Sequence, residues 1–161
     1  MTIFFVLIFV FFIFEPRLHS RLPYESSVSV ERSNESDTVI FLDDFNKAKE
    51  LSRTERKPLL IFFTLSDNES CKRSFELFSN QEIRRLAKYF ICVSVDGALS
   101  GAICESYRVN GFPTVLILDA DNKEIQRLTG KETKEHLSVQ MHIAIQVLTI
   151  PGISSEKNKL R

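Results

Sequence analysis

Cysteine is the residue type in this chain best suited to covalent chemistry, because a thiolate attacks disulfides and other electrophiles. Cys71 follows the apolar run Leu59–Phe63 near the start of a predicted helix. The neighbouring charge of Glu69 disfavours a thiolate at Cys71, whereas Lys72 and Arg73 favour it. Cys71 is therefore either a reactive thiol or a small buried side chain, and the sequence leaves both interpretations open.

The other two cysteines, Cys92 and Cys104, have sequence neighbours that favour a structural role. Cys92 lies between Ile91 and Val93 in a predicted strand, where a free cysteine behaves as a small hydrophobic residue. Cys104 lies on a short predicted helix. In an exported domain, a Cys71–Cys104 or a Cys92–Cys104 disulfide is compatible with the sequence, and one cysteine then stays unpaired.

Composition excludes several other functions. The chain has 21 basic and 21 acidic residues, so its net charge is zero and no basic patch predicts binding to nucleic acid. No cofactor is predicted. Zinc ligands usually come in closely spaced pairs. No metal site is predicted, because no such pair occurs among Cys71, Cys92, Cys104, His19, His136 and His142.

Hydrophobic periodicity predicts helices and strands in alternation after residue 38. The expected elements are a helix capped by Asp43 or Asp44 that ends near Arg53, a strand Leu59–Phe63, helices Ser70–Phe78 and Gln81–Lys88, a strand Phe90–Asp96, a helix Gly101–Tyr107, a hairpin of Thr114–Asp119 and Ile125–Leu128, and a helix Glu132–Thr149. This order is typical of an α/β fold, a three-layer α/β/α sandwich with a central mixed sheet.

The N-terminus carries an export or membrane signal. Residues 3–14 form an unbroken apolar run of twelve, shorter than the roughly 20 residues that cross a bilayer and within the usual length of a signal-peptide core. We therefore interpret residues 1–14 as a signal peptide or an uncleaved membrane anchor. A buried helix of the fold is disfavoured because the run has no polar face. Arg17 and Arg21 follow the run, so the orientation of an anchor stays open.

Three further segments complete the domain organisation. Residues 15–38 are rich in Ser, Glu and Arg, without apolar periodicity, and are expected to form a flexible linker. Residues 39–150 hold the predicted elements and are long enough to bury one core. Residues 151–161 are expected to form a disordered tail.

Three motifs resemble exported, single-domain members of the thioredoxin-like superfamily. They are Lys57–Thr64 (KPLLIFFT), Phe78–Ile83 (FSNQEI) and Tyr107–Thr114 (YRVNGFPT). In that family a lysine-proline strand precedes the sequence F-W-A-x-W-C-x-x-C-K, and a G-x-P-T turn follows later. The resemblance covers about residues 40–140 and implies a thioredoxin-like fold. Anterior-gradient proteins and the UAS domains of ubiquitin-pathway adaptors are related in the same way.

The resemblance also implies which residues form the site. Cys71 aligns with the second cysteine of the family motif, and Asn68 stands where the first cysteine would attack a substrate disulfide. A cis bond is implied between Phe112 and Pro113. Phe112, Pro113 and Thr114 would then form the surface on which the main chain pairs with an extended substrate segment.

Two functions follow, and the sequence does not decide between them. In the first, the protein is exported (extracytoplasmic, periplasmic or secretory) or anchored through residues 3–14, and Cys71 makes mixed disulfides with a thiol-containing protein. In the second, it is a redox-inactive module that holds an extended peptide on the face around Pro113. Dithiol turnover is disfavoured because the attacking cysteine is absent. A cytosolic ubiquitin-adaptor role fits less well, because the N-terminus is a membrane signal.

Overall fold

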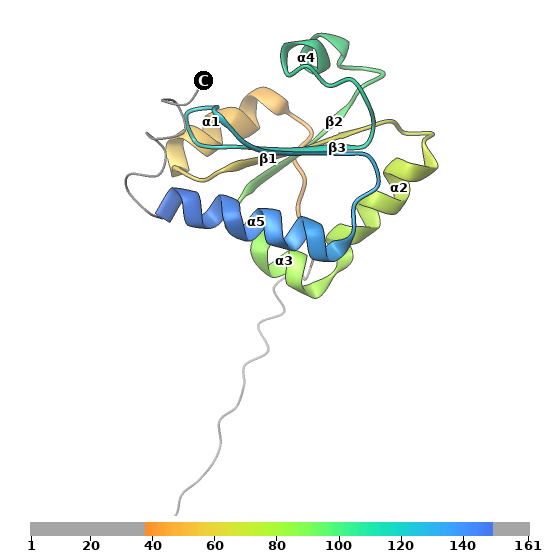
Figure 1. Ribbon diagram of the computed structural model, residues 1–161. Helices are drawn as coiled ribbons and strands as arrows, with labels where there is room; N and C mark the ends of the chain where they lie inside the picture. The colour runs from red at the N-terminus through yellow and green to blue at the C-terminus, as the bar shows by residue number, and fades with distance from the viewer. Residues whose placement is uncertain (1–37, 150–161) are drawn as a thin grey trace, which may run out of the picture. The chain divides into compact units, whose positions relative to one another are not determined.

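Helices and strands alternate along the chain in the predicted order (Figure 1). The computed structural model describes residues 38–149, so the interpretations of residues 1–14, of almost all of 15–38 and of 151–161 lie outside the described residues. The elements are α1 (Phe45–Glu55), β1 (Leu59–Thr64), α2 (Glu69–Glu76), the 3-10 helix η1 (Leu77–Ser79), α3 (Gln81–Ala87), β2 (Ile91–Asp96), α4 (Gly101–Ser106), β3 (Thr114–Leu118), β4 (Glu124–Thr129) and α5 (Lys134–Thr149).

The middle layer is a mixed sheet with the strand order β2-β1-β3-β4. Strand β1 pairs with β2 in parallel and with β3 antiparallel, and β4 pairs antiparallel with β3. The register sets Phe63 opposite Thr114 and Leu59 opposite Leu118. The end of β1 therefore lies beside the start of β3, which brings the loop into α2 and the turn before β3 to the same end of the sheet.

Two apolar cores cover the two faces of the sheet, and β1 contributes to both. Leu60 and Phe62 belong to the core under α3 and α5, whereas Ile61 belongs with Leu59 and Phe63 to the core under α1 and α4 (Figure 1). The unbroken apolar run of this strand arises because side chains alternate between two buried faces. The predicted three-layer α/β/α sandwich with a central mixed sheet is confirmed.

Side-chain caps fix where the helices begin. Asp44 caps α1 by accepting a hydrogen bond from the amide of Lys47 at 3.0 Å. Asn80 caps α3 in the same way, through the amides of Glu82 and Ile83. Several predicted ends shift: α1 continues to Glu55, α2 ends at Glu76 and gives way to η1, and α5 begins at Lys134. No helix in residues 38–149 has the length and hydrophobicity needed to span a membrane.

The segment just before α1 adds a pairing that the sequence does not predict. Leu42 forms an isolated parallel bridge with Val93 of β2. Its amide donates to the carbonyl of Cys92 at 2.9 Å, and its carbonyl accepts from the amide of Ser94 at 3.0 Å. The outer edge of β2 is therefore paired at this point, which limits the unpaired main chain that an edge strand would present.

Candidate functional site

Asn68 caps the helix that carries Cys71. Its backbone is extended, and its Oδ1 accepts hydrogen bonds from the amide of Ser70 at 2.9 Å and from that of Cys71 at 3.0 Å. Asparagine is among the preferred N-cap residues because its short side chain reaches these otherwise unpaired amides. The amides that would stabilise a thiolate at the start of α2 are thus already bonded to a neutral oxygen.

Cys71 is a free thiol, and its residue is 1% exposed. It lies in the first turn of α2 and contributes to the wall of a cavity of about 290 Å³ between this helix and the ends of β1 and β2. Apolar side chains form much of the cavity, and Phe75, one turn after Cys71, is 47% exposed. The full lining is Phe62, Thr64, Leu65, Ser66, Cys71, Lys72, Phe75 and Ser94.

The charged residues next to Cys71 pair with each other. The Nζ of Lys72 lies 2.9 Å from Oε1 of Glu69. The hydrogen bond and charge of Glu69 raise the pKa of Lys72, and the same contact lowers the pKa of Glu69. The opposing influences that the sequence assigns to Glu69 and Lys72 are therefore combined in one surface ion pair.

The turn before β3 is held from within. The Phe112–Pro113 peptide bond is cis, and Pro113 is buried. Thr114 is 2% exposed, and its hydroxyl donates to the carbonyl of Gly111 at 2.8 Å. The carbonyl of Pro113 accepts from the amide of Gly130 at 2.8 Å. The side chains of Pro113 and Thr114 thus shape the turn.

Phe112 has a packed ring and a free main chain. Its side chain is partly buried against the core under α1 and α4. Among residues 38–149, none forms a hydrogen bond with the amide or the carbonyl of Phe112. The strand register places this turn at the end of the sheet from which α2 departs. The structure therefore brings Phe112 and Cys71 to one end of the sheet, but Phe112, Pro113 and Thr114 do not line the Cys71 cavity.

Two loops at this end of the sheet are joined by Asp96. Its carboxylate accepts hydrogen bonds from the Ser66 hydroxyl and, at 2.8 Å, from the amide of Ala98. These two bonds, that of Ser66 first, lower the pKa of Asp96. The amide of Gly97 also donates to the carbonyl of Thr64 at 2.8 Å. The sequence analysis did not identify this connection, although an Asp-Gly pair after a strand is a known turn signal.

Cys92 and Cys104 are buried free thiols on opposite faces of the sheet. Cys92 belongs to the core under α3 and α5, and Cys104 to the core under α1 and α4. A disulfide between them, which the sequence left open, would have to pass through the sheet. Burial raises the pKa of Cys92 to about 12, and burial followed by the charge of Asp96 raises that of Cys104. Both therefore have the structural environment that the sequence indicates.

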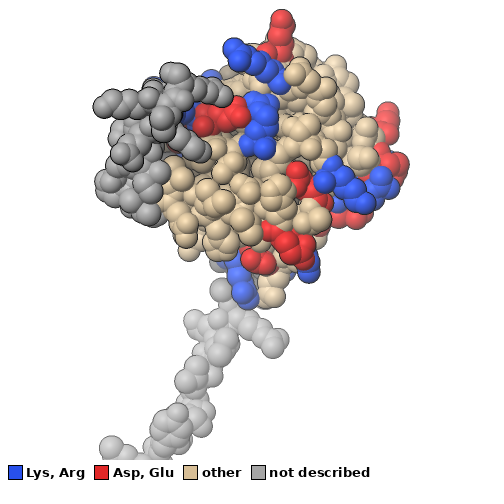
Figure 2. Space-filling model, viewed as in Figure 1, with Lys and Arg blue, Asp and Glu red and all other residues tan. Residues whose placement is uncertain are grey.

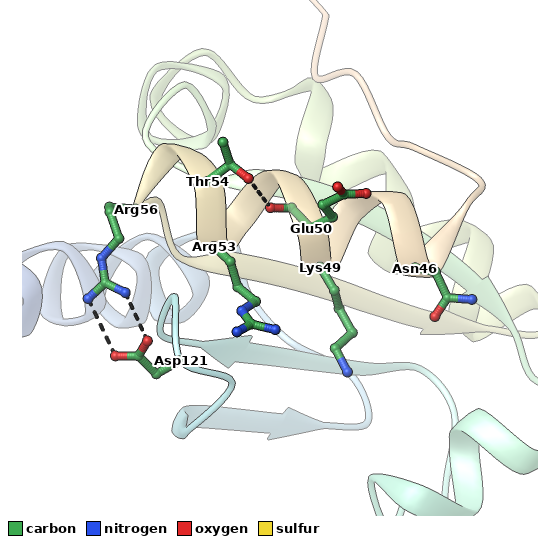
Figure 3. A pocket seen from close by; sticks show the side chains of 7 residues that line it. All are labelled: Asn46, Lys49, Glu50, Arg53, Thr54, Arg56 and Asp121. Atoms are coloured by element: carbon green, nitrogen blue, oxygen red, sulfur yellow. Dashed lines mark hydrogen bonds and ion pairs between the residues drawn. The ribbon is translucent and has the colours of Figure 1, made fainter.

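A larger cavity, of about 590 Å³, lies on the exposed face of α1 beside the β3–β4 turn (Figure 3). Arg56 reaches across it to Asp121, with atoms 2.8 Å apart, and the side chains of Lys49 and Arg53 point from the helix toward the hairpin. The full lining is Asn46, Lys49, Glu50, Arg53, Thr54, Arg56 and Asp121. Because β3 runs antiparallel to β1, this cavity lies at the other end of the sheet from Phe112, and it contains no predicted site residue.

Charge is spread evenly over the visible surface. On the face shown in Figure 2, acidic and basic side chains are interspersed, and uncharged residues separate them. Within residues 38–149, no group of three His, Cys, Asp or Glu side chains is close enough to hold a metal ion.

Comparison with known proteins decides the family. The sequence model of a family described as thioredoxin-like matches residues 40–120, half of the chain. The chain belongs to the thioredoxin-like family. Among curated proteins, the thioredoxin-related protein DsbJ of Chlamydia pneumoniae is 26% identical over 127 residues, which cover 69% of this chain and 36% of DsbJ. The thioredoxin-like chain thus spans about a third of the length of that relative.

Solved structures show the same fold. A thioredoxin from Thermus thermophilus superimposes with a TM-score of 0.64 at 19% identity, over 77% of this chain and 98% of that one. A DsbH oxidoreductase superimposes with a TM-score of 0.58 at 21% identity, over 67% and 85%. The thioredoxin-like fold predicted from the three sequence motifs is confirmed.

Proposed function

We propose that this thioredoxin-like protein holds an extended segment of a partner polypeptide along the main chain of Phe112, and that it does so without dithiol turnover. The observation that carries the proposal is the free amide and carbonyl of Phe112, which no described residue bonds. An extended peptide can pair with such groups as an added strand, and main-chain pairing then supplies the affinity.

The surroundings of Cys71 support binding over turnover. Turnover requires a nucleophile at position 68, and Asn68 instead caps the helix there. Cys71 as a residue is 1% exposed, so a large electrophile does not reach its thiol without local opening. A surface that binds through its main chain needs neither thiol.

We further propose that the domain works outside the cytosol or at a membrane. Residues 1–14 would act as the signal peptide or anchor, residues 15–38 as the linker, residues 39–150 as the binding domain, and residues 151–161 as the tail. The support is the apolar run at residues 3–14. The partner would be an extended or thiol-containing polypeptide, not a nucleic acid.

A second candidate function uses Cys71 as a single reactive thiol, and the cavity of about 290 Å³ beside it favours this candidate. In that step the Cys71 thiolate attacks one sulfur of a partner disulfide. A Cys71–partner disulfide forms, the partner's S–S bond breaks, and the other partner sulfur leaves as a thiolate. The complex would then persist, because this chain has no nearby cysteine at position 68 to resolve it.

Hydrogen exchange tests the proposed function. The full-length protein in detergent is mixed with reduced, carboxymethylated α-lactalbumin, a permanently unfolded chain without free thiols. We expect slowed exchange at the amides of Gly111, Phe112 and Thr114. Native α-lactalbumin is the control and should give no protection. If exchange at these amides is not slowed at a saturating concentration of the unfolded chain, the proposal is contradicted.

A thiol variant separates the two candidates. Cys71→Ser should bind the carboxymethylated chain as well as the wild type if the Phe112 main chain provides the contact. Under the second candidate, a disulfide-containing unfolded protein forms a covalent complex with the wild type that Cys71→Ser does not form. Mass spectrometry without reductant distinguishes the two results.

A further inference from the structure

The ring of Phe112 lies directly on Gly97. A Cβ built on Gly97 would lie 2.2 Å from Cζ of Phe112 and 2.5 Å from its Cε1. Distances this short do not occur between real atoms in contact, so any side chain at position 97 displaces the ring. The backbone of Gly97 has no positive φ, since Gly130 is the glycine with that property among the described residues. The close approach of the ring, rather than backbone conformation, is what requires glycine here.

Gly97 is itself fixed to the rest of the site. Its amide donates to the carbonyl of Thr64, at the end of β1, at 2.8 Å. The carboxylate of the preceding Asp96 accepts from the Ser66 hydroxyl, in the loop that leads to α2. The surface under the Phe112 ring is therefore part of the same bonded loops that position the start of α2.

Phe112 is held in place by the packing of its ring. Gly111 is held by the Thr114 hydroxyl and Pro113 by the amide of Gly130, each at 2.8 Å. Phe112, between them, has no main-chain hydrogen bond to a described residue. A side chain at position 97 would force the ring into another rotamer or shift the Cα of Phe112. The packing of the ring on Gly97 therefore restrains the main chain to which the amide and the carbonyl belong.

We propose that Gly97 is a positioning residue for peptide binding: it receives the Phe112 ring and thereby fixes the main-chain groups that pair with a partner segment. This inference rests on the proposed function. It assigns to Gly97, which the sequence analysis did not identify, control over the affinity of main-chain groups through the Phe112 ring that it contacts.

Binding affinity of three variants tests the inference, with fluorescently labelled, carboxymethylated α-lactalbumin as the ligand and the full-length protein in detergent. We expect Gly97→Ala to weaken binding at least tenfold. Gly101→Ala is the matched control, because a Cβ on Gly101 meets no atom within 4 Å, and its affinity should match the wild type. The double variant Gly97→Ala/Phe112→Leu should recover most of the affinity, since leucine lacks the Cε and Cζ atoms that collide.

A structural readout keeps the result interpretable. In the wild type, the Phe112 ring should displace the Gly97 Hα resonances by its ring current, and Phe112→Leu should abolish the displacement. Wild-type affinity in folded Gly97→Ala, or a double variant no tighter than Gly97→Ala, would overturn the inference and leave the proposed function standing. A wild type that does not bind the unfolded chain would overturn both.

Discussion

The Oδ1 of Asn68 accepts a hydrogen bond from the amide of Cys71 at 3.0 Å. Asn68, which the resemblance aligns with the family's first cysteine, therefore caps the helix that carries Cys71. A cysteine sulfur at position 68 could accept a hydrogen bond from the same Cys71 amide. The neutral side-chain oxygen of Asn68 accepts that bond but has no redox activity. If that alignment holds, this chain has a helix cap where the family has a nucleophile.

Loss of this cap should lower stability. We expect Asn68→Ala to reduce the free energy of unfolding by about 1 kcal/mol, because two amides of the first turn lose their partner. Asn68→Asp keeps an oxygen in the same place and should lose much less. Urea denaturation of the full-length protein measures both variants. Equal stability of Asn68→Ala and the wild type would show that the cap contributes nothing.

Asn68→Cys should rebuild a C-x-x-C pair with Cys71. With oxidised glutathione, we expect the two thiols to form an intramolecular disulfide and release two molecules of glutathione. Some disulfide reductase activity toward insulin should accompany it. Asn68→Ser, which adds no thiol, is the control. Absence of a 68–71 disulfide in peptide mapping would mean that Cys71 does not correspond to the family's second cysteine.

Cys92 should make stability fall at alkaline pH. Burial raises its pKa from 9.0 to about 12, so above pH 9 the unfolded chain loses this proton before the folded chain does. The contribution is complete below pH 9 and is lost as pH rises toward 12. We expect a slope from this thiol of about 1.4 kcal/mol per pH unit. Unfolding free energies of Cys92→Ala between pH 9 and 11 should show a shallower decline, and parallel curves would refute the assignment.

The Thr114 hydroxyl should matter more than that of its cross-strand neighbour. Thr114→Val removes the bond to the Gly111 carbonyl inside a residue that is 2% exposed, and we expect a loss of about 1–2 kcal/mol. Thr129 lies opposite in the β3–β4 register but is exposed. Thr129→Val should therefore change stability by less than about 0.5 kcal/mol. Thermal unfolding of the Thr114→Val and Thr129→Val variants compares their stabilities. Equal losses of stability would argue against a specific role for the hydrogen bond to the Gly111 carbonyl.

The elements of the fold were predictable because their signals are local. The apolar run Leu59–Phe63 indicates a strand from a few adjacent residues, and the pair Asp43 and Asp44 signals a helix start within one turn, which the structure assigns to Asp44. The turn at Ala120–Asn122 likewise follows from adjacent residue types. Each of these signals depends on residues that are adjacent in the sequence, so it can be recognised without knowledge of the tertiary structure.

The contacts that shape the candidate site depend on distant residues instead. Leu42 pairs with Val93, and Gly97 approaches Phe112, only after the sheet has brought their segments together. The family resemblance implies that Phe112 belongs to a peptide-binding surface, but it does not show that the ring lies against a glycine. The separation of Cys92 and Cys104 onto opposite faces also follows from the sheet and not from spacing. The functional roles of Cys71, Phe112, Pro113 and Thr114 stay predictions.

The pairing of Leu42 with Val93 also has a mechanical consequence. Tension transmitted along the chain from residues 1–37 reaches the packed side chains of Val39 and Phe41 first, and then this short parallel bridge. Its two hydrogen bonds, to Cys92 and from Ser94, lie on either side of one residue, so they would share the load before α1 is pulled. If the apolar N-terminus holds the protein at a membrane, this bridge would bear the force once the packing of Val39 and Phe41 has given way.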